Sequence, residues 1–305
     1  MIVSPDRRIV ISSFGWVEHD ALWRFDAASG AVATIRLGSG ARWVSVHHSG
    51  TPYFSVAHHF DGPRFELTVR EFDRPGDVVA SARVDEGPAV IEGASDAWQS
   101  VPELYTTYLR CEPWNDYVLV RIATEPPALT LHGFPWFDST FDKGYQGVIE
   151  VLKIPGRETA IVSVTRCSDL FLHDLGSGRS DGRIRLAGAL GNPHIEFAPR
   201  ERDLWATDYD TLVVVDGVRW RAIRSARLQA ASPGTQLFIG GFSFAPDEDV
   251  CFVARPFNRD VAAVDVRTLK PRRSVPVSGQ PLDVAALGGG RFIARDWKTG
   301  ALLFV

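Results

Sequence analysis

The chain has 305 residues, of which 45% are hydrophobic and 23% charged, and its formal net charge is −4 at pH 7. This is an ordinary globular composition, which excludes extended disorder. The small negative charge lacks the basic stripe that nucleic-acid binding requires, so we expect no nucleic-acid partner. No run of about 18 apolar residues occurs, so we expect no membrane-spanning helix.

The chain start and the cysteines bear on the cellular compartment. Met1-Ile2-Val3-Ser4 begins the first repeat without a basic region or an apolar signal-peptide core. Cys111, Cys167 and Cys251 are odd in number and far apart, which favours reduced thiols over a disulfide framework. We therefore predict a cytoplasmic protein, with a removed signal peptide as the alternative.

A repeat of similar length runs through the chain. Short apolar strands follow Pro/Gly/Asp turns at seven anchor residues: Ile11, Phe54, Leu119, Ile161, Trp205, Phe252 and Ile293. The steps between them are 43, 65, 42, 44, 47 and 41 residues. Periods of about 40 to 50 residues with several strands per unit are typical of β-propeller blades. The sequence predicts an all-β, seven-bladed β-propeller formed by residues 1–305 as one domain.

The clearest repeat lies between Thr235 and Gly279 and predicts four strands, as propeller blades have. The predicted strands are 237–245, 250–254, 261–266 and 274–277, with a turn at 246–249. Two basic stretches, Arg219 to Arg227 and Lys270 to Arg273, fall on predicted outer strands, where charge protects a sheet edge. Five carboxylates near the ends of third strands are predicted to accept turn amides: Asp26, Asp73, Asp174, Asp216 and Asp265.

The last repeat stops at Val305, at the end of its third strand, while Met1 begins partway along the first inner strand. We therefore predict a three-stranded last blade and ring closure by packing of the first blade on the seventh. A homodimer that covers the exposed edge is an open alternative.

These repeats resemble a known family. The stretches are Ala245-Pro246-Asp247, Val264 to Thr268 and Val277 to Pro281, with further matches at Ser4-Pro5-Asp6 and Gly191-Asn192-Pro193. They are similar to the YVTN-type seven-bladed propellers related to the amine-dehydrogenase heavy chain. The resemblance implies a scaffold without a fixed activity. It also implies no covalent quinone, which belongs to a separate light chain in those enzymes, and we expect no cofactor.

Residues eleven positions before six of the anchors are predicted to lie near the mouth of the central channel: Trp43, Tyr108, Glu150, His194, Gly241 and Leu282. Glu150 and His194 suit acid–base catalysis, with Trp43 and Tyr108 as pocket walls. Packing between blades is the alternative role for all four.

Two segments are expected to cap the same channel end. The insertion 85–107 contains Trp98, and the loop 134–146 contains Trp136, Phe137 and Tyr145. Segments this rich in aromatic residues exceed what a spacer needs, so they predict a ligand pocket or a partner surface.

A metal site would require three or four converging ligands. The candidates are His19, His58, His59 and His194 with Glu18 or Glu150. Adjacent histidines on a strand point to opposite faces, so we predict no metal site.

Three functions remain open. The first is a small-molecule binding protein or an enzyme, such as a lyase, cyclase or lactone hydrolase, that uses the channel mouth. The second is a non-catalytic protein–protein interaction scaffold that uses the same face. The third is a metalloenzyme built on the histidines. Named catalytic motifs, such as Gly-x-Ser-x-Gly and His-Glu-x-x-His, are missing from the sequence.

Overall fold

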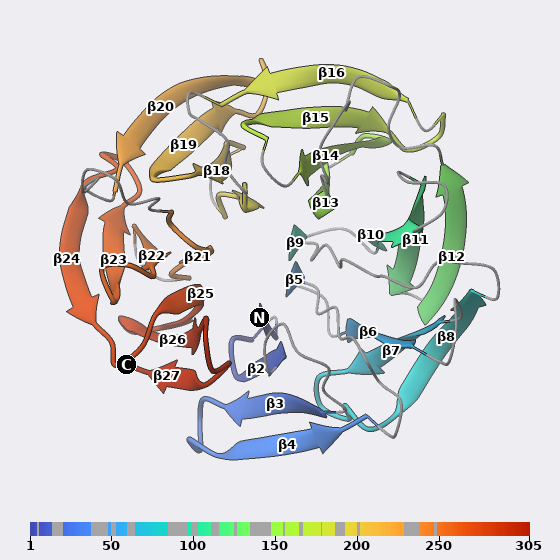
Figure 1. The fold of residues 1–305 in the computed structure, drawn as a ribbon, viewed down its shortest axis with the longest axis horizontal. Helices are drawn as coiled ribbons and strands as arrows, with labels where there is room; N and C mark the ends of the chain where they lie inside the picture. Colours follow the sequence, from blue (N-terminus) through green and yellow to red (C-terminus); the bar gives the residue numbers. More distant parts are fainter. Residues whose placement is uncertain are drawn as a thin grey trace. The chain divides into compact units, whose positions relative to one another are not determined.

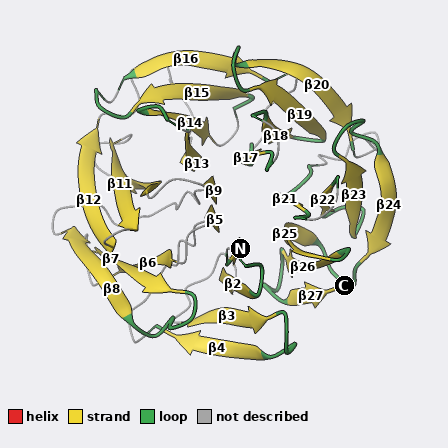
Figure 2. Cartoon of the chain, turned by 180° about the vertical axis from the view of Figure 1, so that it is seen from behind, coloured by secondary structure: helices red, strands yellow, loops and turns green. Residues whose placement is uncertain are grey.

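A computed structural model gives the fold. It describes residues 1–4, 6–13, 21–37, 48–49, 53–59, 65–84, 97–98, 103–110, 116–124, 127–134, 148–154, 156–164, 167–177, 179–186, 193–199, 202–228, 238–246 and 249–305. All secondary structure in these residues is β-strand, and none is helix (Figure 2). This part of the chain accordingly contains no helix able to cross a membrane.

The described strands form seven antiparallel sheets of three or four strands, and two short strands pair in parallel. Within each sheet the strands follow one another in sequence order, so every sheet is a meander. The chain divides into two compact units. Unit 1 contains Met1, 166–170 and 184–305, and unit 2 contains 2–165 and 171–183.

Unit 2 holds the first three sheets in the sequence and most of the fourth (Figure 1). The first sheet consists of β1 (Ile2–Val3), β2 (Ile9–Ser13), β3 (Ala21–Asp26) and β4 (Val32–Arg36). The second consists of β6 (Tyr53–His59), β7 (Phe65–Glu71) and β8 (Val78–Val84), and the third of β10 (Glu103–Arg110), β11 (Asp116–Thr124) and β12 (Pro127–Phe134). The fourth consists of β13 (Val148–Lys153), β14 (Thr159–Val164), β15 (Asp169–Asp174) and β16 (Ser180–Arg185).

Unit 1 holds three complete sheets. The first consists of β17 (Ile195–Phe197), β18 (Leu204–Asp208), β19 (Thr211–Asp216) and β20 (Arg221–Arg227). The second consists of β21 (Phe242–Phe244), β22 (Val250–Arg255), β23 (Asp260–Asp265) and β24 (Pro271–Pro276). The third has three strands, β25 (Pro281–Gly288), β26 (Arg291–Asp296) and β27 (Leu302–Phe304), so the prediction of a three-stranded last sheet is confirmed.

The predicted inner strand 237–245 is longer than the strand that forms. Regular pairing in β21 covers only Phe242 to Phe244. Ahead of it, the Ile239 and Gly241 amides donate to Tyr209 O and Leu282 O, which belong to the two neighbouring sheets. Because these amides bond to neighbouring sheets, they do not take part in the regular hydrogen-bond ladder between β21 and β22.

The repeat around Phe54 also departs from the four-strand expectation. Its described sheet is β6–β7–β8, and the preceding strand β5 (His48–Ser49) pairs in parallel with β9 (Ala97–Trp98) instead. The insertion 85–107 therefore contributes a strand. Residues 103–107 of the insertion belong to the strand 103–110, whereas residues 85–96 and 99–102 and the loop 135–146 lie outside the described residues.

The core of unit 1 lies between sheets. All six residues of β22 are buried, and their alternate side chains join two different clusters. Cys251 and Val253 pack with Trp205, whose ring is 5.1 Å from that of Phe244. Phe252 faces the other way and lies 5.0 Å from Phe292 of β26. Because a buried aromatic side chain contributes about 1.5–3 kcal/mol, these contacts dominate the cohesion of the unit.

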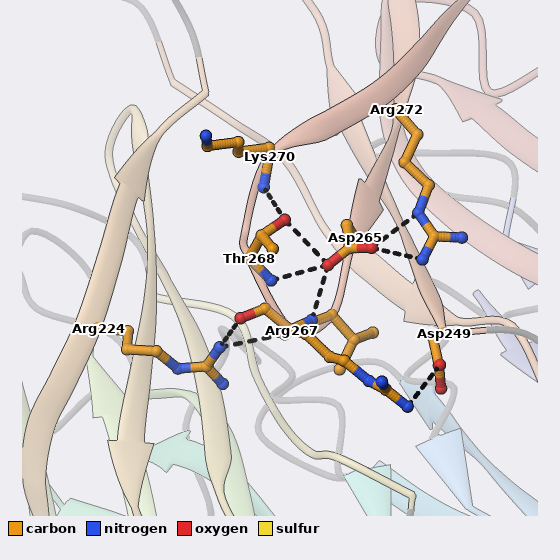
Figure 3. Close-up of polar contacts among 8 residues, drawn as sticks. Arg224, Asp249, Asp265, Arg267, Thr268, Lys270 and Arg272 are labelled. Atoms are coloured by element: carbon orange, nitrogen blue, oxygen red, sulfur yellow. Dashed lines mark hydrogen bonds and ion pairs between the residues drawn. The ribbon is translucent and has the colours of Figure 1, made fainter.

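The predicted role of the third-strand carboxylates is confirmed for Asp26, Asp174, Asp216 and Asp265, each of which accepts turn amides. The most extensive network surrounds Asp265 (Figure 3). Its Oδ1 accepts from the amides of Arg267 and Thr268 and from the Thr268 hydroxyl, and its Oδ2 accepts from Arg272. The Arg272 guanidinium and then the Thr268 donors hold the pKa of Asp265 well below its usual range.

This network predicts a loss of stability in acid. Because the pKa is lower in the folded than in the unfolded chain, the stabilisation is complete above about pH 5 and declines as the pH falls below about 4. The Asp265→Asn variant should be less stable than the wild type at pH 6, and the difference should shrink at pH 3. Urea unfolding at both pH values measures it. An equal difference at both pH values would contradict the assignment.

Candidate functional site

At one end of the sheets in unit 1 lie the first residues of each inner strand and the turns that follow each second strand. We call it the upper end. It comprises the starts of β17, β21 and β25, the turns β18–β19 and β26–β27, and the loop β22–β23. Trp297 N–H, in the β26–β27 turn, donates to Gln280 O at the start of β25. The β18–β19 turn is held by Leu228 N–H, which follows β20 and donates to Asp210 O, and Asp208 Oδ1 at the end of β18 accepts from Ser168 Oγ at 2.9 Å.

Three residues occupy the same pairing position at the upper end. The Thr207 amide donates to His194 O, and the His194 amide donates to the Thr207 hydroxyl at 2.8 Å. Gly241 O accepts from the Ala254 amide in the next sheet. Asp283 pairs with Arg295 in the third sheet, in the same register as Ala285 with Ile293, and Leu282 falls at a bulge between Pro281 and Asp283. Asp283, not the predicted Leu282, is therefore the partner at this position.

His194 and Asp283 both approach the Gly241–Phe242 segment. The half-buried imidazole of His194 packs edge-on against the Phe242 ring at 5.1 Å. Asp283 Oδ1 lies only 2.7 Å from the place that a Cβ on Gly241 would occupy, so this glycine makes room for the carboxylate. Arg295 Nη2 donates to Asp283 Oδ2, which compensates the carboxylate charge.

The other predicted site residues are placed only in part. Glu150 lies in β13 opposite Ser163, and Tyr108 lies in β10 opposite Val118. Trp98 lies in β9. The side chains of these three residues, and Trp43, Trp136, Phe137 and Tyr145 entirely, lie outside the described part of the chain. The approach of Glu150 to His194 therefore stays a prediction.

The sequence did not single out an aromatic cluster at the upper end. Phe238 precedes β21, Phe257 lies in the loop between β22 and β23, and Trp297 follows β26. The ring centroids of Phe238 lie 5.4 Å from Phe257 and 5.2 Å from Trp297, and the last two rings are 6.1 Å apart. All three pairs are nearly perpendicular, at 79–85°. Phe257 is 37% exposed and the other two are half-buried.

A buried ion pair fixes the loop that carries Phe257. Arg255 Nε and Nη2 donate to the two carboxylate oxygens of Asp260 at 2.8 and 2.5 Å. The same guanidinium donates to Leu228 O at 2.8 Å and to Ser274 Oγ at 2.6 Å. A two-pronged pair with further bonds is rigid, so it holds both ends of the loop together.

The described residues offer few groups for catalysis or metal binding. They contain no group of three or more His, Cys, Asp or Glu residues that could hold a metal ion, while His19 and the side chains of His58 and His59 lie outside them. Burial raises the pKa of the Cys251 thiol well above its usual range, which makes it a poor nucleophile. Cys167 is half-buried.

Comparison with known proteins identifies the fold. No family model matches the chain, and no curated protein matches its sequence. Its structure is similar to the Cps50 (Swd1) β-propeller domain of Myceliophteria thermophila, with a TM-score of 0.71 and 11% identity over 99% of this chain and 93% of that one. It is also similar to apo AztD from Citrobacter koseri, with 15% identity over 90% and 71% of the chains, but a TM-score of 0.48 supports no argument.

Together with the all-β meanders, the first similarity shows that the protein has a β-propeller fold. The predicted fold class is therefore confirmed. At 11% identity the similarity carries no information on activity.

The buried ion pair gives a second prediction. Arg255→Met leaves the Asp260 carboxylate buried without its partner, so the free energy of unfolding should fall by about 3–5 kcal/mol. The double variant R255M/D260L should recover most of the loss, because no uncompensated charge remains. Urea unfolding measures both. Arg267→Met, at an exposed pair with Asp249, is the control and should cost far less. A small loss for Arg255→Met would contradict the structural role.

Proposed function

We propose that this β-propeller is a non-catalytic interaction scaffold that binds a protein segment at the upper end of unit 1. The observation that carries the proposal is the partly exposed cluster of Phe238, Phe257 and Trp297. Aromatic residues are enriched in the buried centres of protein interfaces, where they supply large contact areas at low entropic cost. The cluster therefore serves as an anchor site for an apolar side chain of the partner.

Preorganisation supports the same proposal. Two of the rings, Phe257 and Trp297, are carried by short connections that are bonded within unit 1, through the Arg255–Asp260 pair and the Trp297–Gln280 bond. A surface that is already ordered loses little entropy on binding, which improves affinity without further contacts. We also propose that the chain forms a single seven-bladed domain of the YVTN type and that the protein is located in the cytoplasm.

The proposal can be tested by selecting 12-residue peptides from a random display library on the immobilised protein. Trp297→Ala should weaken binding of the recovered peptides at least about 30-fold, the scale of an interface hot spot. Trp220→Ala is the matched control, since Trp220 packs on Phe197 near the β19–β20 turn, at the other end of its sheet. It should leave the affinity unchanged. Recovered peptides that bind Trp297→Ala as tightly as the wild type would refute the proposal.

The small-molecule alternative has one observation in its favour. Glu150 lies opposite Ser163 and His194 lies opposite Thr207. Ser163 and Thr207 each lie two residues after an anchor residue, so Glu150 and His194 occupy equivalent positions in their sheets. Equivalent positions on consecutive sheets are where a Glu/His acid–base pair would be expected.

This alternative predicts that His194→Gln leaves folding intact and lowers turnover by about 10²–10⁴, the usual effect of losing a general acid–base group. A panel of small lactones is the substrate set, and circular dichroism checks the fold. Wild-type protein without activity on the panel, or a variant with unchanged activity, would leave the scaffold function in place.

A further inference from the structure

The charges beside the aromatic cluster indicate what kind of segment it binds. We infer that the partner segment is acidic, with Asp or Glu residues next to the apolar side chain that contacts Phe238, Phe257 and Trp297. This inference rests on the proposed function and specifies the partner of the same site.

Two cations belong to the turns that carry the rings. Arg259 lies two residues after Phe257, and Lys298 directly follows Trp297. Both side chains belong to exposed residues, and neither takes part in any of the ion pairs found among the described residues. Both charges are therefore available to a partner.

The carboxylates of the same turns are not available. Asp260 is 9% exposed and is bound by Arg255. Asp296 is 6% exposed, and its oxygens accept from the amides of Gln280, Lys298 and Thr299. The turns thus bury their negative charges and expose their positive ones.

The carboxylates near the cluster do not neutralise the two exposed positive charges. At the same end, Asp283 is paired with Arg295, and Asp210 is paired with Arg227. An apolar centre with a positive rim is complementary to a segment with an apolar centre and a negative rim.

Nucleic acid fits this surface less well than an acidic peptide. Two cations beside three rings give little attraction for a phosphate backbone, which is usually bound through many Lys and Arg contacts. An acidic peptide needs only one or two charge contacts in addition to its apolar anchor.

The peptide selection described above also tests this inference. Peptides recovered on the wild type should be enriched in Asp and Glu beside an aromatic or aliphatic residue. The double variant R259E/K298E should bind them about 10-fold more weakly at 50 mM NaCl, and the loss should shrink at 500 mM NaCl because salt screens exposed charges. R221E/R273E makes the same change of charge on the exposed edge strands β20 and β24 and should have little effect.

Each contrary result has a distinct meaning. Neutral or basic peptides that still require Trp297 would overturn the inference and leave the proposed function standing. An equal loss in R259E/K298E and R221E/R273E would also overturn it, because the effect would then be one of net charge. A single-stranded oligonucleotide that binds more tightly than the peptides and depends on Arg259 and Lys298 would replace the acidic peptide as the partner. Peptides that do not require Trp297 would refute the proposed function itself.

Discussion

Unit 1 depends on one constraint, which is that each sheet must bury both of its faces against neighbouring sheets. Strand β22 shows this most clearly, because Cys251 and Val253 pack toward one neighbour and Phe252 toward the other. A strand buried on both faces needs a continuous apolar run, which is what residues 250–254 provide. The edge strands β20 and β24 carry arginines and prolines instead, in agreement with their predicted outer position.

Close packing of the sheets brings the starts of their inner strands together. A Cβ on Gly240 would lie 2.0 Å from Leu282 O, so only glycine permits the backbones to approach this closely. The same approach brings Asp283 over Gly241 and allows the Gly241 amide to bond to Leu282 O. The geometry of the upper end is thus a consequence of packing between sheets, and the turns that carry the aromatic cluster inherit their positions from it.

Counting back from the anchor residues identified the upper end of the sheets but missed some of its important residues. Counting eleven residues back from Trp205 reached His194, which does lie at the start of its sheet. The same count from Ile293 reached Leu282, which falls at a bulge, because the connection between β25 and β26 brings Ala285 opposite Ile293 with one residue fewer than the connection that brings Glu196 opposite Trp205. The signal for Phe257 and Trp297 was present as an aromatic residue shortly after the second strand in two successive repeats. Nothing in the sequence joined these residues to Phe238.

By itself, the sequence determined the all-β repeat, the three-stranded last sheet and the carboxylates that hold the third-strand turns. These features follow from alternation, turn residues and hydrogen bonds within a few residues, which are local and therefore legible along the chain. Only the tertiary structure decided which side chains meet at the upper end. Phe238 precedes β21 and Phe257 lies in the β22–β23 loop of the same sheet, whereas Trp297 lies in the β26–β27 turn of the neighbouring sheet. The Arg255 guanidinium reaches Leu228 O in a third sheet. Contacts of this kind depend on how the sheets stack. No local pattern of residues encodes the distance between side chains of different sheets.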